Sequence, residues 1–431
     1  MHIAMFSNTY LPFVGGLTIS VASYAESIRK RGHRVLVVAP EFDGQAEDET
    51  DVLRVPAIKH FANSRFSIPL VLPGEFHDAL DDFAPDLIHA HHPYLLGDTA
   101  LREATTRAVP LVVTHHTHAL LYASNLPEKL KWLAMFLDDL GIGYCNLCDA
   151  VIAPSQGVRR ELAGAGVTQP MHVIPTGLDE ERFGSGDGAA IRKRFDIPED
   201  AYLIGHVGRL APEKNLGFLM PVLLDALERL PEAHLLIVGK GDMDEELRAM
   251  AAASPHADRV CFAGVSTGQD LVDAYYAMDV FAFASYSETQ GMVLAEAMTA
   301  GTPVVALEAR GVEDILEDGV NGRMISGEDS EAFTEALVWM HERRSDDWSE
   351  RCRKSAEPFG MQSCTTRVLA LYEDLIASRA GEPAPRDEGS LQRLLSAATA
   401  QYDIGANAIN AVISALSTPV DAWEEHYRHG D

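Results

Sequence analysis

Two glutamates eight residues apart, Glu288 and Glu296, stand in the segment SETQGMVLAEAMTAGTPVVA. An apolar, strand-like run precedes this segment, and Gly301 is placed to end the helix that follows, so the helix is expected to begin near Gln290 or Gly291. Glu288 then lies on the loop and Glu296 inside the helix. Backbone N–H groups at a helix start lack partners within the helix and attract anions. Carboxylates before and behind such a start are suited to accept hydrogen bonds from the hydroxyls of a ligand whose diphosphate lies between them.

The two glutamates alone have a plainer explanation, as a charge at a helix start and a solvated helix residue. A second loop, HVGRLAPEKN at residues 206–215, favours the ligand instead. Arg209 and Lys214 stand on this loop and at the start of the next helix, after the first strand of the second half of the chain. Two cations there can neutralise a departing diphosphate without a metal ion, each contributing up to about 4 kcal/mol at ~4 Å and an effective dielectric constant of ~20, before desolvation.

A glycine loop, SNTYLPFVGGL at residues 7–17, precedes an expected helix. Gly15 and Gly16 would let the backbone of this loop approach a phosphate or a sugar closely. The loop does not have the GxGxxG spacing of a nicotinamide site, and the later GKG at residues 239–241 has Asp244 where a third glycine belongs. Neither loop supports a dinucleotide cofactor.

Histidines gather in the segment VTHHTH, and His91 and His92 stand upstream of it. Neither carboxylates nor cysteines stand near them at metal-ligand spacing, so a metal site is not expected. His116 is interpreted as a hydrogen-bonding ring in a cleft, whereas His115 or His118 would serve packing.

Short β-branched runs alternate with amphipathic helical stretches along most of the chain, which is typical of parallel strands joined by right-handed crossovers. The strands expected in the first half are Ile3–Ser7, Val35–Ala39, Leu87–Ala90, Leu111–Thr114, Ala150–Ala153 and Met171–Ile174. Those expected in the second half are Leu203–Val207, His234–Val238, Arg259–Phe262, Val280–Ala284 and Pro303–Ala306. Ligands of open α/β sheets bind beyond the carboxyl ends of the strands, which is where the loops described above lie.

A Gly- and Ser-rich stretch at residues 183–188 separates the two halves. The sequence therefore predicts an α/β protein of two doubly wound, Rossmann-like domains that face each other across a cleft. We assign residues 1–180 to the first domain and residues 186–357 to the second, with a late helix at about 359–378. Residues 388–431 are expected to form a helical extension, either as a hairpin packed on the body or as an oligomer contact.

The chain has 431 residues, which suits two domains, and a formal net charge of −29. This acidity argues against a nucleic-acid partner, whose phosphates need cationic neutralisation, and allows at most a peripheral contact with an anionic membrane. It also fits adaptation to high salt.

Five scattered cysteines, with a lone CxxC at Cys145 and Cys148, fit reduced thiols in a cytoplasm rather than disulfides, zinc or redox chemistry. The first residues, MHIAMFSN, enter a strand without a signal peptide, and no apolar run approaches the ~18 residues of a membrane span. A cytoplasmic protein is expected, peripheral at the inner membrane face if it meets a membrane at all.

Together these loops resemble the GT-B-fold retaining glycosyltransferases of family 4, in the same order and up to about residue 376. The most specific element of the resemblance is E-x7-E, at Glu288 and Glu296. The second is G-R-x-x-x-x-K, at Gly208, Arg209 and Lys214. The glycine loop and the histidine segment are supporting matches.

The resemblance implies a site for a nucleotide-diphosphate sugar. The first glutamate and the following amides would hold the sugar, the second glutamate the ribose, the arginine and lysine the diphosphate, and the histidine the sugar near its reacting end. Val265 corresponds to a position whose backbone reads the nucleobase. The donor-binding residues are expected to be Gly15, Gly16, Gly208, Val265, Thr289, Gln290, Gly291, Met292 and Glu296. The catalytic residues are expected to be His116, Arg209, Lys214 and Glu288.

The resemblance also implies transfer of a hexose with retention of configuration, from a UDP-sugar or else a GDP-sugar, without a metal ion or another cofactor. The diphosphate would leave toward Arg209 and Lys214, while the acceptor hydroxyl attacks the same face and gives its proton to the leaving phosphate oxygen. The first domain would bind the acceptor, and the late helix would cross back onto it.

The acceptor is open at this point. The stretches SETQG and THHTH are most similar to family members that glycosylate diacylglycerol or other membrane lipids. Those enzymes carry a basic, aromatic helix, whereas the matching stretch here balances Lys129 and Lys131 against Glu128, Asp138 and Asp139.

Trp132, Met135 and Phe136 in the same stretch could enter a bilayer, although their helical spacing is more typical of a core. A small soluble or polysaccharide-precursor acceptor is the alternative. Two other classes of function are a sugar-nucleotide epimerase and a catalytically silent partner subunit that only binds a nucleotide-sugar.

Overall fold

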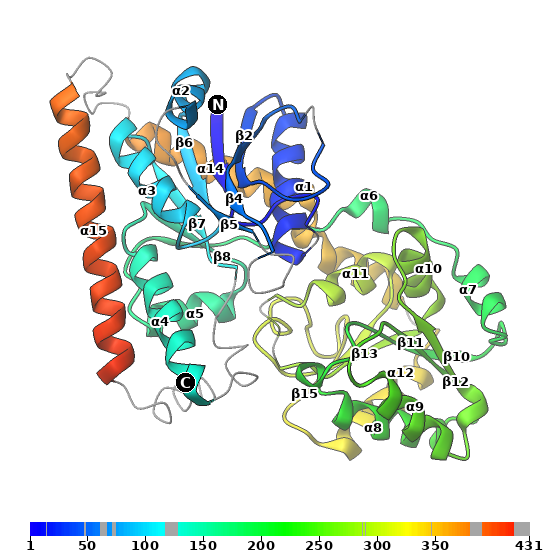
Figure 1. The fold of residues 1–431 in the computed structure, drawn as a ribbon. Helices are drawn as coiled ribbons and strands as arrows, with labels where there is room; N and C mark the ends of the chain where they lie inside the picture. The colour runs from blue at the N-terminus through cyan, green and yellow to red at the C-terminus, as the bar shows by residue number, and fades with distance from the viewer. Residues whose placement is uncertain are drawn as a thin grey trace. The chain divides into compact units, whose positions relative to one another are not determined.

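The structure is a computed structural model that describes residues 1–13, 15–46, 49–60, 67–70, 75–116, 128–286, 288, 290–345, 347–379 and 390–417. The chain divides into two compact units (Figure 1). Unit one consists of Met1–Gly177 and Cys364–Asp431, and unit two consists of Leu178–Ser363.

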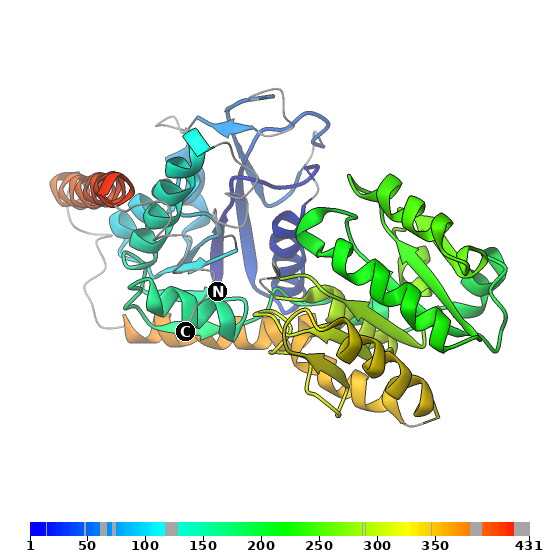
Figure 2. The same ribbon diagram turned by 90° about the horizontal axis from the view of Figure 1, so that it is seen from below.

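Unit one is built on a seven-stranded parallel sheet with the order β3-β2-β1-β6-β7-β8-β9. Its strands are β1 (His2–Phe6), β2 (Arg34–Pro40), β3 (Val52–Val55), β6 (Leu87–Ala90), β7 (Leu111–Thr114), β8 (Ala150–Ala153) and β9 (Met171–Val173). A small antiparallel pair joins β4 (Ala57–Ile58) to β5 (Ile68–Pro69). The helices that flank the sheet (Figures 1 and 2) are α1 (Gly16–Lys30), α2 (Glu75–Phe83), α3 (Leu96–Arg107), α4 (Glu128–Cys145), α5 (Gln156–Gly164) and α14 (Met361–Ser378). A further helix, α15 (Ser390–Ser417), lies outside α3 and α4.

Unit two is built on a six-stranded parallel sheet with the order β12-β11-β10-β13-β14-β15. Its strands are β10 (Tyr202–Val207), β11 (Ala233–Val238), β12 (Val260–Gly264), β13 (Val280–Phe283), β14 (Val304–Leu307) and β15 (Gly322–Ile325). Its helices are α6 (Glu180–Phe183), α7 (Gly188–Arg194), α8 (Leu216–Arg229), α9 (Asp244–Ala253), α10 (Gln269–Ala277), α11 (Met292–Ala300), α12 (Ser330–Glu342) and α13 (Trp348–Ala356).

The strands of unit two are mostly apolar because both faces of the sheet are covered, although polar residues such as His206, His234 and Arg323 stand within them. In β13, Phe281 and Phe283 pack into one core cluster, while Val280 and Ala282 pack into the cluster on the other face. Successive side chains of a strand point to opposite faces, so a continuous apolar run fills both cores at once. Burial on both faces fixes the position of the strands, and the strands in turn position the loops that follow their carboxyl ends.

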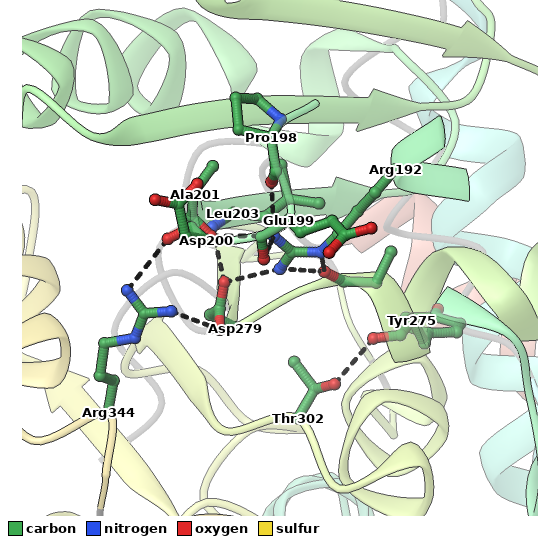
Figure 3. A network of polar contacts seen from close by, with 11 residues as sticks. Arg192, Pro198, Glu199, Asp200, Ala201, Leu203, Tyr275, Asp279, Thr302 and Arg344 are labelled. Carbon is green, nitrogen blue, oxygen red and sulfur yellow. Dashed lines mark hydrogen bonds and ion pairs between the residues drawn. The ribbon is translucent and has the colours of Figure 1, made fainter. Parts of the chain in front are cut away.

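A polar network ties together the amino ends of β10 and β13, at the opposite edge of the sheet from those loops (Figure 3). The Arg192 guanidinium of α7 donates to the Asp279 carboxylate at 2.8 Å and to the carbonyls of Ala201 and Ala277 at 2.8 and 2.7 Å. The same Asp279 oxygen accepts from the backbone N–H of Leu203 at 2.8 Å. One largely buried arginine thus joins a helix to two strands.

Two parallel, doubly wound sheets confirm the predicted fold class. The eleven predicted strands are present, with ends shifted by no more than two residues. The strands β3, β4, β5 and β15 were not predicted. The late helix begins at Met361 rather than near 359, because residues Glu357–Phe359 form a 3₁₀ turn.

The C-terminal extension contains one continuous helix between residues 390 and 417, so these residues do not form the helical hairpin that was one of the two expectations. This helix, α15, packs on α3 and α4, as expected for a segment that lies on the body. Among the described residues, no helix is both long enough and apolar enough to cross a membrane.

Candidate functional site

The loop after β10 and the loop after β13 meet through two of the predicted residues. Lys214, at the end of a 3₁₀ turn that leads into α8, donates from Nζ to the Glu288 carboxylate in an ion pair. Both side chains are about four-fifths buried, with 21% and 17% of their surface exposed. Two residues 74 positions apart in the chain therefore form one charged pair at the carboxyl edge of the sheet.

Arg209 supplies a second cation on the same loop and is more open. Its guanidinium pairs with Glu213 one turn later, and 63% of its side chain is exposed. A ligand with a diphosphate can reach this charge without displacing any packed side chain. Gly208, the residue before it, is bonded through its N–H to the carbonyl of Val238 at 3.0 Å.

The start of α11 is shaped by glycines. Gly291 caps this helix in the left-handed region, with φ 63°, and Gly301 ends it with φ 91°, as predicted for the end of the helix. A Cβ on Gly291 would lie 2.7 Å from the carbonyl oxygen of Gly311, and a Cβ on Gly311 would lie 2.6 Å from the backbone nitrogen of Gln290. Only glycine fits at both places, so the loop after β14 lies directly on the helix start.

Glu296 is held from behind by a tyrosine. The Tyr275 hydroxyl of α10 donates to Glu296 Oε2 at 2.7 Å, and Tyr275 itself is fully buried. Burial raises the pKa of Glu296 to about 7, although the tyrosine hydrogen bond opposes this shift. Glu296 is therefore not the solvated helix residue of the plainer explanation.

The remaining predicted positions of unit two fall on or beside these loops. Met292 opens α11, and Gln290 is buried just before it. Val265 follows β12 with 69% of its surface exposed, where a ligand can meet its backbone. Thr289 lies outside the described residues.

The GKG segment has a packing role. A Cβ on Gly239 would lie 1.8 Å from the carbonyl oxygen of Gly208, and a Cβ on Gly241 would lie 2.3 Å from that of Leu210. The loops after β10 and β11 thus approach each other through backbone, which supports the loop that carries Arg209.

In unit one, Gly15 and Gly16 stand at the start of α1. Gly15 is the residue before the helix and has an extended backbone, with φ −161° and ψ 163°. A Cβ on Gly16, the first residue of the helix, would meet no atom within 4 Å, so packing does not require a glycine there. The first N–H groups of this helix are a second potential anion site.

His116 lies in a layer of buried histidines beyond β6 and β7. Its Nε2 is 3.0 Å from Nδ1 of His91, whose ring packs on that of His89 with centroids 4.1 Å apart. His89 contacts Thr114 Oγ1 at 2.7 Å and the hydroxyl of Tyr372, on α14, at 2.5 Å.

These rings are uncharged at neutral pH. Burial lowers the pKa of His89 to about 3 and that of His92 to about 4, and it lowers the pKa values of His91 and His116 as well. His116 can therefore offer a hydrogen bond but not a full charge. His118 lies outside the described residues.

No metal site is assembled in the part of the chain that the structure describes. The cysteines of the CxxC pair, Cys145 and Cys148, are buried in the core of unit one, and burial raises the pKa of Cys145 to about 12. Both thiols act as apolar packing groups there.

Sequence reasoning missed three residues that support the site: Tyr275, Gly311 and Glu213. Gly311 carried a usable signal, because a glycine shortly after a predicted strand at the carboxyl edge of a sheet often marks close approach of two loops. Nothing in the spacing of Tyr275 pointed to Glu296, which stands on a different helix.

Comparison with known proteins gives two adjacent family matches. Residues 14–182 match the model described as Glycosyltransferase Family 4, and residues 187–357 match that described as Glycosyl transferases group 1. A GDP-mannose-dependent alpha-mannosyltransferase of Mycobacterium tuberculosis is 31% identical over 80% of this chain and 89% of its own length. An alpha-monoglucosyldiacylglycerol synthase of Streptococcus pneumoniae is 27% identical over 88% of this chain and 87% of its own.

Solved structures agree at the level of the fold. Anabaena Alr3699/HepE in complex with UDP-glucose has a TM-score of 0.65, with 20% identity over 87% of this chain and 100% of its own. WaaG, a glycosyltransferase involved in lipopolysaccharide biosynthesis, has a TM-score of 0.62, with 18% identity over 86% of this chain and 99% of its own.

Proposed function

Since the chain belongs to glycosyltransferase family 4 and has the GT-B fold, we propose that it moves a hexose from a UDP-sugar to an acceptor hydroxyl with retention of configuration. That it is a nucleotide-sugar glycosyltransferase follows from its relatives. The finer proposal is supported by one observation above all: Lys214 and Glu288 form a pair in front of the α11 helix start, and Glu296 stands behind it.

In the proposed reaction the donor diphosphate lies at the start of α11, where Lys214 and Arg209 neutralise its charge. The bond between the sugar C1 and the phosphate oxygen breaks, and the acceptor oxygen forms its bond to C1 on the same face. The acceptor proton passes to the departing phosphate oxygen, so the step needs neither a side-chain nucleophile nor a metal ion. Catalysis then consists of positioning and of charge stabilisation that is present before the reaction.

The two glutamates would divide the donor between them. Glu288 would leave Lys214 to the diphosphate and accept hydrogen bonds from the sugar hydroxyls, while Glu296 would accept those of the ribose. The uncharged His116 would hydrogen-bond the sugar near its reacting end without adding charge there.

A membrane lipid such as diacylglycerol is the acceptor that we propose. Two alpha-monoglucosyldiacylglycerol synthases, from Streptococcus pneumoniae and Acholeplasma laidlawii, match most of the chain at 27% and 25% identity. Near the start of α4, Trp132 and Leu133 expose 47% and 38% of their surface, whereas Met135 is buried in the unit. Exposed residues of this kind suit a shallow contact with a lipid surface.

A soluble acceptor and a GDP-sugar donor are the second candidate, favoured by the GDP-mannose-dependent relatives. A panel of UDP-, GDP- and ADP-sugars, offered to the purified chain with diacylglycerol in detergent micelles or with soluble acceptors, separates the two. The anomeric configuration of the product, read by NMR, tests retention. Tight nucleotide binding with neither transfer nor donor hydrolysis would instead identify a silent partner subunit.

The site is tested by Lys214→Ala and Glu296→Ala, each of which should reduce turnover by orders of magnitude without loss of folding. Lys193→Ala is the matched control, because this exposed lysine lies on α7, away from the loops at the carboxyl edge. Near-normal turnover of either site variant would refute the proposed site.

A further inference from the structure

Helix α15 has two apolar faces, and only one of them is covered by the described part of unit one. On the inner face, Ala400, Ala411 and Ala415 are buried against the body. Asn407 donates to the carbonyl of Leu140 in α4 at 3.0 Å, and Gln401 accepts from Arg102 in α3 at 3.0 Å. Figures 1 and 2 show this helix on the outside of α3 and α4.

The opposite face is apolar and exposed. Leu395, Tyr402, Ile409 and Ile413, here called the outer seam, expose 59%, 75%, 62% and 58% of their surface. Their spacing of seven, seven and four residues places them on one stripe along about 27 Å of helix at ~1.5 Å per residue. Between them stand the small residues Ala398 and Ala406, which allow another helix to approach closely.

A surface of this kind is unusual on a protein that works alone. A helix that is apolar on opposite faces is normally buried on both. Contiguous apolar patches of more than a few hundred Å² are rare on monomers and mark contact sites. The outer seam, with four large side chains more than half exposed, reaches that order of size.

The charge of α15 and of the whole chain helps to distinguish a lipid surface from a protein partner as the group that covers the outer seam. A helix that lies on an anionic bilayer needs lysines and arginines beside its apolar face. In its 28 residues α15 has one arginine, Arg393, and one aspartate, Asp403. The chain as a whole carries a formal charge of −29, which adds repulsion from an anionic lipid surface.

The sparse charge of α15, rather than the net charge of the chain, makes a second copy the fitting partner. Two chains of −29 repel each other, so a contact between them is favoured where charges are sparse, and the outer seam is such a place. Pairing of two identical seams around a twofold axis would bury both of them, with large residues of one helix set against small residues of the other. Burial on both copies then reaches the range of weak, specific interfaces, on the order of 1,000 Å² in total.

We propose that the outer seam of α15 is a homodimer interface, in which two copies of this chain pair helix to helix. The inference is independent of the catalytic site, because the seam residues lie on α15 and the proposed donor-binding groups of unit two lie at the carboxyl edge of its own sheet.

The full-length protein, studied by sedimentation velocity over a range of concentrations, should show a dimer. Ile409→Glu should shift it to the monomer, because a charge in the seam cannot be paired there. Asn410→Glu is the matched control: it adds the same charge to an exposed neighbour on the polar flank and should leave the dimer intact. Circular dichroism checks that both variants fold.

A wild-type protein that stays monomeric at all concentrations would overturn the proposal, and so would a dimer that survives Ile409→Glu. Sedimentation with phosphatidylglycerol vesicles would then show whether a bilayer covers the seam. A chain ending at Ser417 that dimerises where the full chain does not would show that residues 418–431 cover it, which also overturns the proposal. Donor hydrolysis by Ile409→Glu distinguishes loss of pairing from loss of the catalytic site.

Discussion

At the scale of single residues, the burial of Glu296 opposes the ionised state that its proposed role requires. In the proposed donor site its carboxyl group would have to be ionised to accept two ribose hydroxyls, yet burial raises its pKa to about 7. The Tyr275 hydroxyl, 2.7 Å away, partly restores the ionised form. The protein thus holds the carboxylate near the midpoint of its titration, where donor binding can decide its charge.

Donor affinity should therefore depend on pH. If only ionised Glu296 accepts the ribose hydroxyls, the affinity for a UDP-sugar falls by up to about tenfold for each pH unit below the pKa and levels off above it. Titration calorimetry one unit below and one unit above pH 7 measures this. Glu296→Gln should remove the dependence, and equal wild-type affinities at the two pH values would contradict the assigned role.

The raised pKa of Glu296 affects the stability of the fold in the opposite direction: donor affinity should rise with pH, whereas stability should fall. Glu296 has a higher pKa in the folded chain than in the unfolded chain, so its protonated form favours folding below the unfolded pKa, and that contribution is lost as pH rises through about 7. The midpoint of thermal unfolding of the wild type should thus fall relative to that of Glu296→Gln over the same range. Tyr275→Phe, which removes the opposing hydrogen bond, should move both effects to higher pH.

At the scale of elements, the amino and carboxyl edges of the sheet in unit two differ in the interactions that they hold. The loops at the carboxyl edge hold exposed charges such as Arg209, whereas the amino edge is fastened by the Arg192 network. Stability and chemistry can therefore be altered separately.

Arg192→Ala should lower the free energy of unfolding by about 2–3 kcal/mol, because the carbonyls of Ala201 and Ala277 lose the guanidinium donor and so does the Asp279 carboxylate, which keeps its bond from the Leu203 N–H. Arg194→Ala is the control on the same helix: its ion pair with Asp270 is about half exposed on both sides, so solvent screens it and its loss should cost much less stability than the loss of Arg192. Urea unfolding measures both. Equal losses would show that the network is not a distinct support, and kcat/KM of both folded variants should match the wild type.

The helices and strands whose burial follows from the order of apolar residues in their own sequence were predictable. β6, β7 and β8 are buried four-residue strands of mostly apolar residues and were predicted to the residue, and Gly301 was predicted to end α11. β4 lies outside the two main sheets and β15 lies at the edge of one of them. Strands in such places need less apolar burial, so their sequences carry a weaker signal.

Features that depend on contacts between distant segments were not predictable in the same way. The fit of Gly311 on Gly291 joins two different loops, and the bond of Tyr275 to Glu296 joins two helices. The sequence of α15 predicted a helical period, but it did not show that one long helix continues through Gly405 and packs on α3 and α4, and a hairpin stayed open as an alternative.

At the scale of the whole molecule, the formal charge of −29 acts on every state of the chain. Ion pairs among the described residues, such as that of Lys30 with Glu26, have side chains that are two-thirds exposed, so they offset little of the repulsion between negative charges. Folding brings these negative charges closer together, so self-repulsion weakens the compact state and added salt screens it.

The midpoint of thermal unfolding should accordingly rise with KCl, as the screening length falls from about 10 Å near 0.1 M to about 3 Å near 1 M. Sucrose at equal osmolality is the control, because it favours compact states without screening charge, and an equal rise in sucrose would contradict an electrostatic cause. Salt also weakens repulsion between two chains, so dimer formation could produce the same trend. Ile409→Glu separates the two: repulsion within one chain does not need a partner, and the salt dependence should persist in this monomeric variant.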